Sequence, residues 1–321
     1  MEFHKDILKI DAARTADELS EVIRRQIRQD LKREGAVVGI SGGIDSTVVA
    51  ALCTRALGPD KVLGVIMPET DSSPDSRNLA ENLAKHLGIQ HVVENITGPL
   101  DGFQCYQRRD EAVKSIFPDF TPDFKTKITI GSNPLEKDGL NYFRLTVEKP
   151  GGEEISKRMP LKPYLQVVAA SNFKQRTRMS MLYYHAERLN WAVAGTGNKD
   201  EHELGFFVKY GDGGADIKPI AHLFKMQVFQ LAEYLQVPEE IRKRIPTTDT
   251  YSAEVTQTDF FFGVPFDILD PVWYAMEHNV PEAKVAEVLN LTEDQVARIM
   301  RDIQQKKRNT GYLRQYPLEV E

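Results

Sequence analysis

The sequence predicts an α/β protein with a doubly wound parallel sheet, and three observations support this fold class. Short apolar runs rich in β-branched residues alternate along the chain with stretches of helical periodicity. A glycine-rich turn directly follows the first of these runs, at residues 39–46. The composition, with 41% hydrophobic and 27% charged residues among 321, is that of an ordinary globular protein. Strands that alternate with helices in this way form parallel sheets, which bind ligands at the carboxyl ends of their strands.

The chain is expected to open with an amphipathic helix over residues 12–31. One face of this helix is apolar and comprises Leu19, Val22, Ile23, Ile27 and Leu31. Buried strands are predicted where apolar residues run together, at 36–38 and 61–67, and further strands are predicted at 90–93 and 191–194. The helices that connect them are predicted over 47–57, 76–87 and 167–189. This order of elements places the glycine turn at the carboxyl end of the first strand.

The turn at residues 39–46, GISGGIDS, connects a strand to a helix, and this geometry suits an anion. The first turn of a helix presents unpaired backbone N–H groups and the positive end of the helix dipole. Gly42 and Gly43 allow the backbone to approach a ligand closely, and two serines add hydroxyl donors. A carboxylate beside phosphates needs a cation between them, so Asp45 is a candidate Mg²⁺ ligand. The turn therefore predicts a phosphate-binding loop.

Two common phosphate-binding motifs are missing from the chain. It has neither GxxxxGK[ST] nor GxGxxG, which argues against a P-loop NTPase and a dinucleotide-binding fold. The run SGGIDS instead resembles the pyrophosphate loop, SGGxDS, of the adenine-nucleotide α-hydrolase superfamily. Enzymes of that superfamily split ATP between the α and β phosphates and attach AMP to a substrate oxygen. An ordinary glycine turn in a βα unit is the alternative interpretation of these residues.

Residues 118–166 depart from the α/β pattern. Apolar residues alternate with polar ones at 128–130 and 143–147, and a Pro-Gly-Gly turn lies within 149–153. We therefore expect a small antiparallel β arm, over 118–166, inserted into the α/β domain. A helical C-terminal extension is expected over 260–321, and residues 1–321 are expected to form one domain.

Later motifs occupy other predicted strand ends and loops. They are Arg-Thr-Arg-Met at 176–179, GTGNKDE at 195–201, FFVKYGDGGAD at 206–216, Lys225, and Pro-Thr-Thr-Asp at 246–249. Three glycines and two aspartates at 209–216 predict an ordered binding loop, with a flexible connector as the alternative. In order and spacing, these motifs resemble the synthetase domain of NAD synthetase over most of the chain. The resemblance implies a ligase that adenylates the nicotinate carboxylate of deamido-NAD with ATP and Mg²⁺, after which ammonia displaces AMP.

The resemblance also implies a role for each matching residue. ATP would be bound by Gly39, Ser41, Gly42, Gly43, Asp45, Ser46, Thr196, Lys225 and Thr247. Deamido-NAD would be bound by Arg176, Tyr183, Lys209, Asp212 and Asp216. Mg²⁺ would lie between Asp45 and Glu201, and the residues expected nearest the reaction are Asp45, Lys209 and Asp212. Simpler structural roles stay open, namely solvent exposure for Lys225 and Arg176, core packing for Tyr183, and a helix N-terminus for Glu201.

Composition and motifs limit the other functions. A net charge of −6 argues against a nucleic-acid partner, and no apolar run approaches the roughly 18 residues of a membrane span. Two functions stay open beside the synthetase. One is a related ATP pyrophosphatase that adenylates another carboxylate or carbonyl, such as nicotinate mononucleotide or a tRNA base, and the other is a non-catalytic adenine-nucleotide sensor. The tRNA-thiolating branch uses a cysteine pair that this chain lacks, and a sensor would not need both Asp45 and Glu201.

The cysteines and the family resemblance lead to expectations about compartment and partners. Cys53 and Cys105 form neither a CxxC motif nor a disulfide framework, which fits a cytoplasmic protein. The resemblance implies a homodimer with a shared substrate cleft, and the helix over 167–189 is the candidate interface. Some family members carry a glutaminase domain, for which this chain has no room. Ammonia is therefore expected to serve directly, and glutamine only through a separate glutaminase.

Overall fold

The structure is a computed structural model, and it describes residues 3–131, 133–136, 142–248 and 250–320. Four parallel strands form its central sheet in the order β3–β2–β1–β7. Their bounds are Ala36–Gly39 for β1, Val62–Ile66 for β2, Gln90–Val93 for β3 and Ala192–Ala194 for β7. Strand β1 lies between two parallel neighbours, with Ala36 paired to Val62 on one side and to Ala192 on the other. The predicted parallel α/β fold is confirmed.

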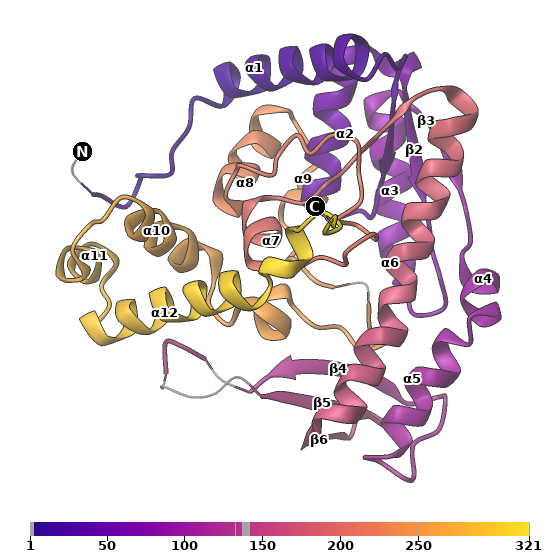
Figure 1. Cartoon of the computed structure of the whole chain (residues 1–321), viewed down its shortest axis with the longest axis vertical. Coiled ribbons are helices and arrows are strands. Elements are labelled where there is room, and N and C mark those ends of the chain that lie inside the picture. The colour runs from indigo at the N-terminus through magenta and orange to yellow at the C-terminus, as the bar shows by residue number, and fades with distance from the viewer. Residues whose placement is uncertain (1–2, 132, 137–141, 249, 321) are drawn as a thin grey trace.

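Successive residues of β1 face opposite layers of helices, and Figure 1 labels the helices of both layers. Ala36 and Val38 pack against one layer, and Val37 packs against the other. The first layer consists of α1 (Ala12–Arg25), α2 (Ile44–Leu57), α3 (Pro74–Leu87) and α8 (Lys225–Tyr234). The second is the long helix α6 (Leu161–Leu189). Side chains alternate between the two faces of a strand. The sequence of a strand that is covered on both faces is therefore a continuous apolar run, as at 36–38.

Several predicted helix boundaries are wrong, and α2 and α3 begin at 44 and 74 rather than at 47 and 76. Helix α6 begins at Leu161 rather than at 167, so the last residues of the predicted arm are helical. Pro163 is compatible with this start, because the first N–H groups of a helix have no partner within it. The first helix ends in a π turn, η1 (Gln26–Asp30), and this wider turn leaves Leu31 37% exposed instead of on the predicted apolar face.

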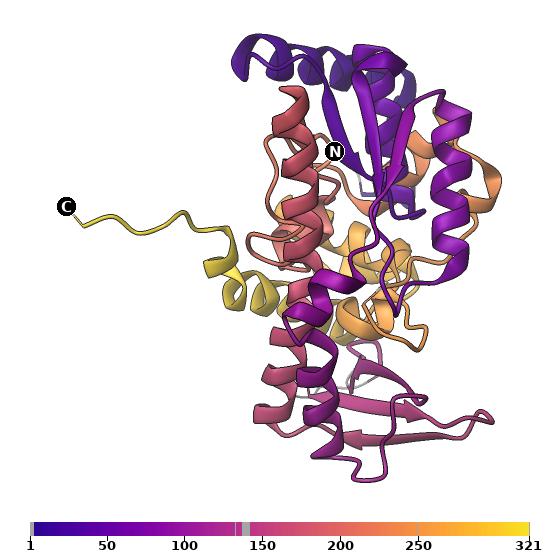
Figure 2. The ribbon, with the colours of Figure 1, turned by 90° about the vertical axis from the view of Figure 1, so that its right-hand side faces the viewer.

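The arm is a three-stranded antiparallel sheet in the order β4–β5–β6, as predicted. Its strands are β4 (Lys125–Ile130), β5 (Phe143–Glu148) and β6 (Glu154–Arg158). Figures 1 and 2 show it beside the N-terminal half of α6, away from the parallel sheet. Ile128 and Leu145 are buried in a core with Val113 of α5 (Cys105–Lys114). Residues 132 and 137–141 of the predicted arm lie outside the described residues.

The C-terminal region is helical, as predicted, and its core contains the fully buried Trp273. Its main helices are α10 (Phe266–Glu277), α11 (Glu282–Leu289) and α12 (Glu293–Asn309). The remaining short helices are α4 (Thr97–Gly102), α7 (Lys199–Leu204), α9 (Glu239–Arg242), η2 (Pro59–Lys61), η3 (Thr258–Phe262) and η4 (Gly311–Arg314). No helix within the described ranges is long and apolar enough to cross a membrane.

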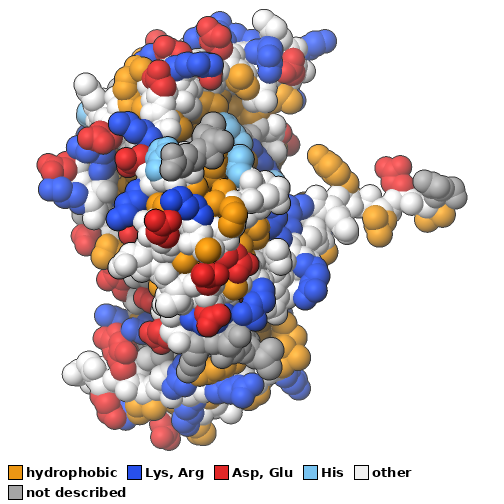
Figure 3. Space-filling model, turned by 90° about the vertical axis from the view of Figure 1, so that its left-hand side faces the viewer, with side chains coloured by type: hydrophobic (Ala, Val, Ile, Leu, Met, Phe, Trp, Pro, Cys, Tyr) orange, Lys and Arg blue, Asp and Glu red, His pale blue; other side chains and the backbone are white. Residues whose placement is uncertain are grey.

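The segment after η4 extends away from the body of the molecule (Figures 2 and 3). Its side chains Tyr316, Leu318 and Val320 are each at least 89% exposed. On the face shown in Figure 3, cationic and anionic side chains are interspersed rather than separated by sign.

Candidate active site

A cavity of about 780 Å³ lies at the edge of the parallel sheet where the strands end. Segments that follow β1, β2 and β7 line it, together with α6, the start of α8 and loops around 206–214 and 244–250. Most of the predicted site residues line this cavity: Gly39, Ser41, Gly43, Asp45, Ser46, Arg176, Thr196, Glu201, Lys209, Asp212, Lys225 and Thr247. Asp249 of the predicted Pro-Thr-Thr-Asp motif lies outside the described residues. The strand ends therefore gather residues that are far apart in the sequence, as expected for a parallel sheet.

The loop after β1 has the geometry of a phosphate cradle. Helix α2 begins directly after the glycines, so the unpaired N–H groups of its first turn lie at this loop. Ser46 Oγ donates to the Gly43 carbonyl at 3.0 Å and lies 3.1 Å from Ser41 Oγ, which holds the two hydroxyls together. Gly42 is outside the cavity lining as the structure describes it. Its φ of +77° favours glycine, and an added Cβ would lie 2.7 Å from the Ser76 carbonyl oxygen.

Asn198 connects the two predicted metal ligands, Asp45 and Glu201. Its Nδ2 donates to Asp45 Oδ1 at 2.9 Å, and its Oδ1 accepts the Glu201 backbone N–H at 3.0 Å. The Asn198 backbone N–H donates to Glu201 Oε2 at 3.3 Å, which completes a capping box at the start of α7. Burial and the neighbouring Asp45 charge raise the pKa of Glu201 to about 8. Glu201 therefore both caps a helix and lies in the electrostatic field of Asp45.

The Asp45–Glu201 pair suits a hard divalent cation. Two carboxylates beside a phosphate-binding loop supply the oxygen ligands that Mg²⁺ prefers, and Mg²⁺ usually completes its shell with water and phosphate oxygens. Among the described residues, no group of three or more His, Cys, Asp or Glu side chains forms a closed metal cage. The raised pKa of Glu201 reflects burial first and then repulsion by Asp45, and a bound cation would relieve the repulsion. The donor set therefore fits a Mg²⁺ ion that is shared with a nucleotide.

Lys225 is fully buried at the start of α8, so it is not the exposed lysine of the alternative interpretation. Its ammonium forms an ion pair with Asp45 Oδ2. Its backbone N–H donates to Asp200 at 2.7 Å, and the N–H of Met226 donates to Asp270 at 2.9 Å. Burial raises the pKa of Asp200 to about 7 and the pKa of Asp270 well above its usual value. Two aspartates without a predicted role thus anchor the helix that carries Lys225.

The loop that contains Lys209 and Asp212 forms another wall of the cavity. Lys209 Nζ donates to the carbonyl of Tyr312 at 3.1 Å and to that of Gln315 at 2.9 Å. The Asp212 carboxylate accepts the Val208 N–H at 2.8 Å. Asp212 lines the cavity. The protein atoms around its carboxyl group displace water, and this desolvation raises the pKa of Asp212 to about 6. These contacts tie the loop to the C-terminal segment of the chain.

Three residues predicted to bind the dinucleotide lie in different settings. Arg176 of α6 lines the cavity, and its Nε donates to the Lys209 carbonyl at 3.4 Å. Tyr183, further along α6, and Asp216 are outside the lining formed by the described residues. The Tyr183 hydroxyl donates to Asp216 Oδ1 at 3.1 Å, and Asp216 Oδ2 accepts the Val193 N–H at 2.7 Å. These two residues hold a loop against β7 rather than pointing into the cavity.

Arg178, Arg244 and Gln257 are among the lining side chains that have no role in the prediction from sequence. Arg178 is in the Arg-Thr-Arg-Met motif, which was a signal for it. Arg244 donates to Ser76 Oγ at 2.9 Å beside the phosphate loop. Gln257 Nε2 donates to Glu201 Oε1 at 3.3 Å. No local pattern marks Arg244 or Gln257, because their partners lie in distant segments of the chain.

Comparison with known proteins gives matches in sequence. The family model described as NAD synthase matches residues 15–117 and 147–314. The NH(3)-dependent NAD(+) synthetase of Mesorhizobium japonicum is 48% identical over 312 residues, which cover 97% of this chain and 98% of the relative. The NH(3)-dependent NAD(+) synthetase of Thermotoga maritima is 37% identical over 267 residues, which cover 82% of this chain and 87% of the relative.

Solved structures share the fold. The NMN synthetase from Francisella tularensis has a TM-score of 0.66 and 22% identity, and the match covers 97% of this chain and 99% of that one. The NH3-dependent NAD synthetase from Campylobacter jejuni has a TM-score of 0.62 and 24% identity, with coverage of 97% and 100%. Because the sequence identity to these two structures is low, the structural similarity shows a shared fold and nothing more. The first strand of this chain leads into the SGGIDS loop. Together with the match to the family model and the sequence relatives, this shows that the protein belongs to the NAD synthase family.

Proposed function

We infer that this chain is an ammonia-dependent NAD synthetase. It is a ligase that amidates deamido-NAD to NAD with ammonia, and ATP is its co-substrate. Relatives of that name cover nearly the whole chain at 45–48% identity. The structural observation that carries the assignment is a cavity of about 780 Å³ that gathers the SGGIDS loop, Glu201 and the loop at 206–214. A volume of this order suits a small-molecule or cofactor site.

The reaction must activate a carboxylate, which is a poor electrophile. A carboxylate oxygen of the nicotinate attacks the α-phosphorus of ATP, and pyrophosphate leaves. Ammonia then attacks the acyl carbon of the acyl adenylate, and AMP leaves as the amide forms. This chemistry requires the protein mainly to position the reactants and to stabilise charge on the phosphates.

We assign the ATP side of the cavity to the loop after β1. The N–H groups at the start of α2 and the hydroxyls of Ser41 and Ser46 would bind the pyrophosphate portion. Thr196 and Thr247 line the adjoining walls, where they would contact the nucleotide. Lys225 would place positive charge beneath the phosphates, although its ammonium is already paired with a carboxylate.

We assign Asp45 and Glu201 as the ligands of Mg²⁺. When bound, the ion would neutralise charge on the pyrophosphate leaving group. Asn198 orients both carboxylates through its side chain and backbone. Burial and the Asp45 charge raise the pKa of Glu201 to about 8, and a nearby cation would favour its ionised form.

We assign the deamido-NAD side to the walls that carry Arg176, Lys209 and Asp212. An ammonium has three hydrogens, and Lys209 donates two of them to backbone carbonyls, so one remains for the substrate. Tyr183 and Asp216 would act indirectly, since their mutual hydrogen bond holds the loop that leads into the site.

We further propose a homodimer that uses α6 as its interface. The helix exposes large apolar side chains along its length, with Leu161 71%, Leu165 53% and Tyr184 58% exposed. Large apolar side chains that are left exposed on a helix are suited to a subunit contact. This helix also supplies Arg176 to the cavity, so an interface there would lie next to the substrate side.

Ammonia is the proposed nitrogen donor, and the cytoplasm is the proposed compartment. Both cysteines are free and buried, as suits a reducing environment. Burial raises the pKa of the Cys53 thiol to about 12 and that of the Cys105 thiol to about 11. Cys105 Sγ also donates to the Ala170 carbonyl at 3.2 Å. Neither thiol is suited to the attack on glutamine, so glutamine would serve only through a separate glutaminase.

The assay that tests the function uses the purified chain with ATP, Mg²⁺ and ammonium. Deamido-NAD should be converted to NAD with equal amounts of AMP and pyrophosphate. Nicotinate mononucleotide is the competing substrate, and a higher kcat/KM for it would contradict the assignment. Binding of ATP without any turnover of either compound would favour a nucleotide sensor.

A further inference from the structure

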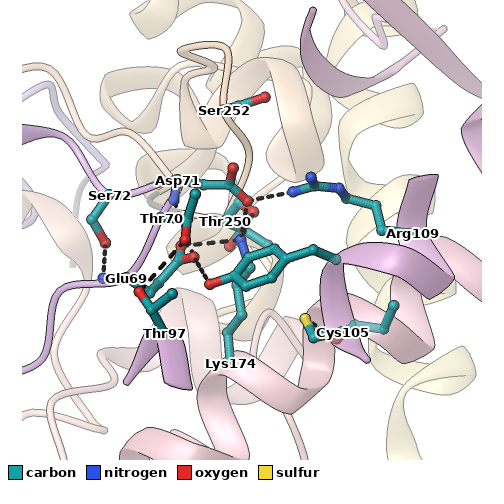
Figure 4. Close-up of polar contacts among 12 residues, drawn as sticks. Glu69, Thr70, Asp71, Ser72, Thr97, Cys105, Arg109, Lys174, Thr250 and Ser252 are labelled. Atoms are coloured by element: carbon teal, nitrogen blue, oxygen red, sulfur yellow. Dashed lines mark hydrogen bonds and ion pairs between the residues drawn. The ribbon is translucent and has the colours of Figure 1, made fainter. Parts of the chain in front are cut away.

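A group of buried charged side chains lies beside the cavity without lining it (Figure 4). It consists of Glu69, Asp71, Tyr106, Arg109 and Lys174, and is called here the Lys174 cluster. The side chains of Lys174 and Glu69 are at most 1% exposed, and Asp71 is 6% exposed. Two carboxylates face two cations, so these charges balance. Because a buried ion cluster adds little net stability over apolar packing, its consequence lies in the geometry that it fixes.

Lys174 donates its three ammonium hydrogens to different parts of the chain. Its Nζ lies 3.0 Å from Glu69 Oε1, 2.6 Å from Asp71 Oδ2 and 2.8 Å from the Thr250 carbonyl oxygen. Glu69 and Asp71 follow β2, whereas Thr250 belongs to the loop of residues 246–257. Because Lys174 itself lies in α6, one ammonium joins three segments of the fold.

Each of these segments also forms a wall of the cavity. The lining residues close to the cluster in sequence are Ser72 and Ser73 after β2, Gln175 and Arg176 in α6, and Thr247 and Thr248 in the loop. The Lys174 cluster therefore connects three segments of the chain that line the site.

The loop of residues 246–257 is anchored at its tip by two kinds of contact. Ser252 Oγ accepts the Thr126 N–H of the β arm at 2.8 Å. The Thr250 carbonyl accepts the Lys174 ammonium, which ties the loop to α6 through a charged donor. Hydrogen bonds with an ionised donor are about twice as strong as neutral ones, so the Lys174 contact should be the strongest single hydrogen bond at the tip, beside the two neutral bonds to Thr126.

We propose that Lys174 is a positioning residue that holds the 246–257 loop in place for ATP. Thr247, the proposed ATP contact in this loop, lies three residues before the anchored Thr250 carbonyl. The proposal rests on the function inferred above. Helix α6 is continuous over 29 residues, and its own hydrogen bonds keep Arg176 in place. Loss of the ammonium should therefore affect the ATP side much more than the dinucleotide side.

The variant Lys174→Met tests the proposal, and Arg109→Met is its matched control. Both remove one cation from the cluster, but Arg109 pairs with Asp71 and Asp110 rather than with the loop. Lys174→Met should raise the KM for ATP about tenfold or more, as expected when a hydrogen bond to a charged group is lost. The KM for deamido-NAD should change by less than about twofold, which is within the spread of surface substitutions. Arg109→Met should leave both KM values within the same limit.

Hydrogen exchange supplies a readout that needs no turnover. The Ala253 N–H donates to the Thr126 carbonyl at the tip of the loop. This amide should exchange faster in Lys174→Met than in the wild type, and Arg109→Met should not change it. A wild-type chain that fails to convert deamido-NAD would contradict the proposed function, while the exchange result would still test the anchor.

Three results would overturn the positioning role. They are an unchanged KM for ATP, an equal change in both KM values, and the same changes in Lys174→Met and Arg109→Met. If Lys174→Met does not fold, the double variant Lys174→Met with Glu69→Gln removes one charge of each sign and keeps the cluster balanced. It still lacks the anchor, so it should show the same selective rise in the KM for ATP.

Discussion

Asp45 and Lys225 form an ion pair beside the cavity although 180 positions separate them in the sequence. The Lys225 side chain is 1% exposed, and that of Asp45 is 13% exposed. Each residue lies in the first turn of its helix, Asp45 in α2 and Lys225 in α8. A cation is unfavourable at a helix N-terminus, and the carboxylate offsets this effect. The pair also reduces the negative charge that the phosphates of a nucleotide would meet.

Replacing Asp45 with Asn should lower turnover by about a hundredfold or more, since it removes a proposed ligand of Mg²⁺ from the cavity. Far-UV circular dichroism should remain that of the wild type, because α2 has no side-chain cap that the change would remove. The matched control is Asp267→Asn, because Asp267 is exposed and is the second residue of α10, as Asp45 is of α2. Near-normal turnover of Asp45→Asn at saturating Mg²⁺ would remove Asp45 from the site.

Gly42→Ala should destabilise the fold and weaken ATP binding. A side chain at positive φ costs roughly 1–2 kcal/mol, and the added Cβ would also lie 2.7 Å from the Ser76 carbonyl oxygen. Gly88→Ala is the control, because Gly88 has a φ of +67° with nothing within 4 Å of an added Cβ. Urea unfolding and ATP titration should show the larger losses for Gly42→Ala. Equal losses for both variants would mean that the close approach to Ser76 has no effect.

Asp212 predicts a pH dependence of stability. Its pKa is raised to about 6 in the folded chain, from an ordinary value near 3.8. Between these two pH values the folded chain holds a proton that the unfolded chain has lost. The contribution of Asp212 to stability is therefore fully present below the lower value and is lost as the pH rises through about 6. Urea unfolding from pH 4 to pH 7 should show Asp212→Asn gaining stability relative to the wild type as the pH rises, and a constant difference would contradict the raised pKa.

The proposed dimer predicts a particle of about twice 36.4 kDa in sedimentation at micromolar concentration. Leu165→Glu should produce monomers, because it places a charge beside the exposed Leu161 on the proposed interface of α6. Leu318→Glu is the matched control, since Leu318 is 89% exposed on the extended C-terminal segment. A wild-type monomer with full activity would rule out a substrate cleft shared between subunits.

The nitrogen source can be tested with two donors. Ammonium should support NAD formation by the purified chain, and glutamine as the sole donor should not, because both thiols are buried and poorly ionised. Cys105→Ala should keep most of the ammonium-dependent rate. Sustained turnover with glutamine that is lost in Cys105→Ala would overturn the prediction.

Local patterns were sufficient to predict the parallel sheet and the phosphate loop. Apolar runs identified β1, β2 and β7, because each of these strands is covered on both faces, whereas β3 lies at the edge of the sheet and none of its residues is fully buried. The SGGIDS turn could be interpreted from its residues, since Gly42 requires a positive φ and the following helix start attracts anions. The alternation of apolar and polar residues at 128–130 and 143–147 identified the strands of the arm, because successive side chains of a strand point to opposite faces.

The tertiary structure decided which charged residues meet. Asp45 meets Lys225 across 180 positions, and Lys174 meets Asp71 across 103. Lys174 has the sequence context of an exposed basic helix, yet it is almost completely buried. The π turn before Leu31 and the pairing of Tyr183 with Asp216 likewise follow from packing. Periodicity reports only the local distribution of apolar residues, whereas the partner of a buried charge depends on the path of the whole chain.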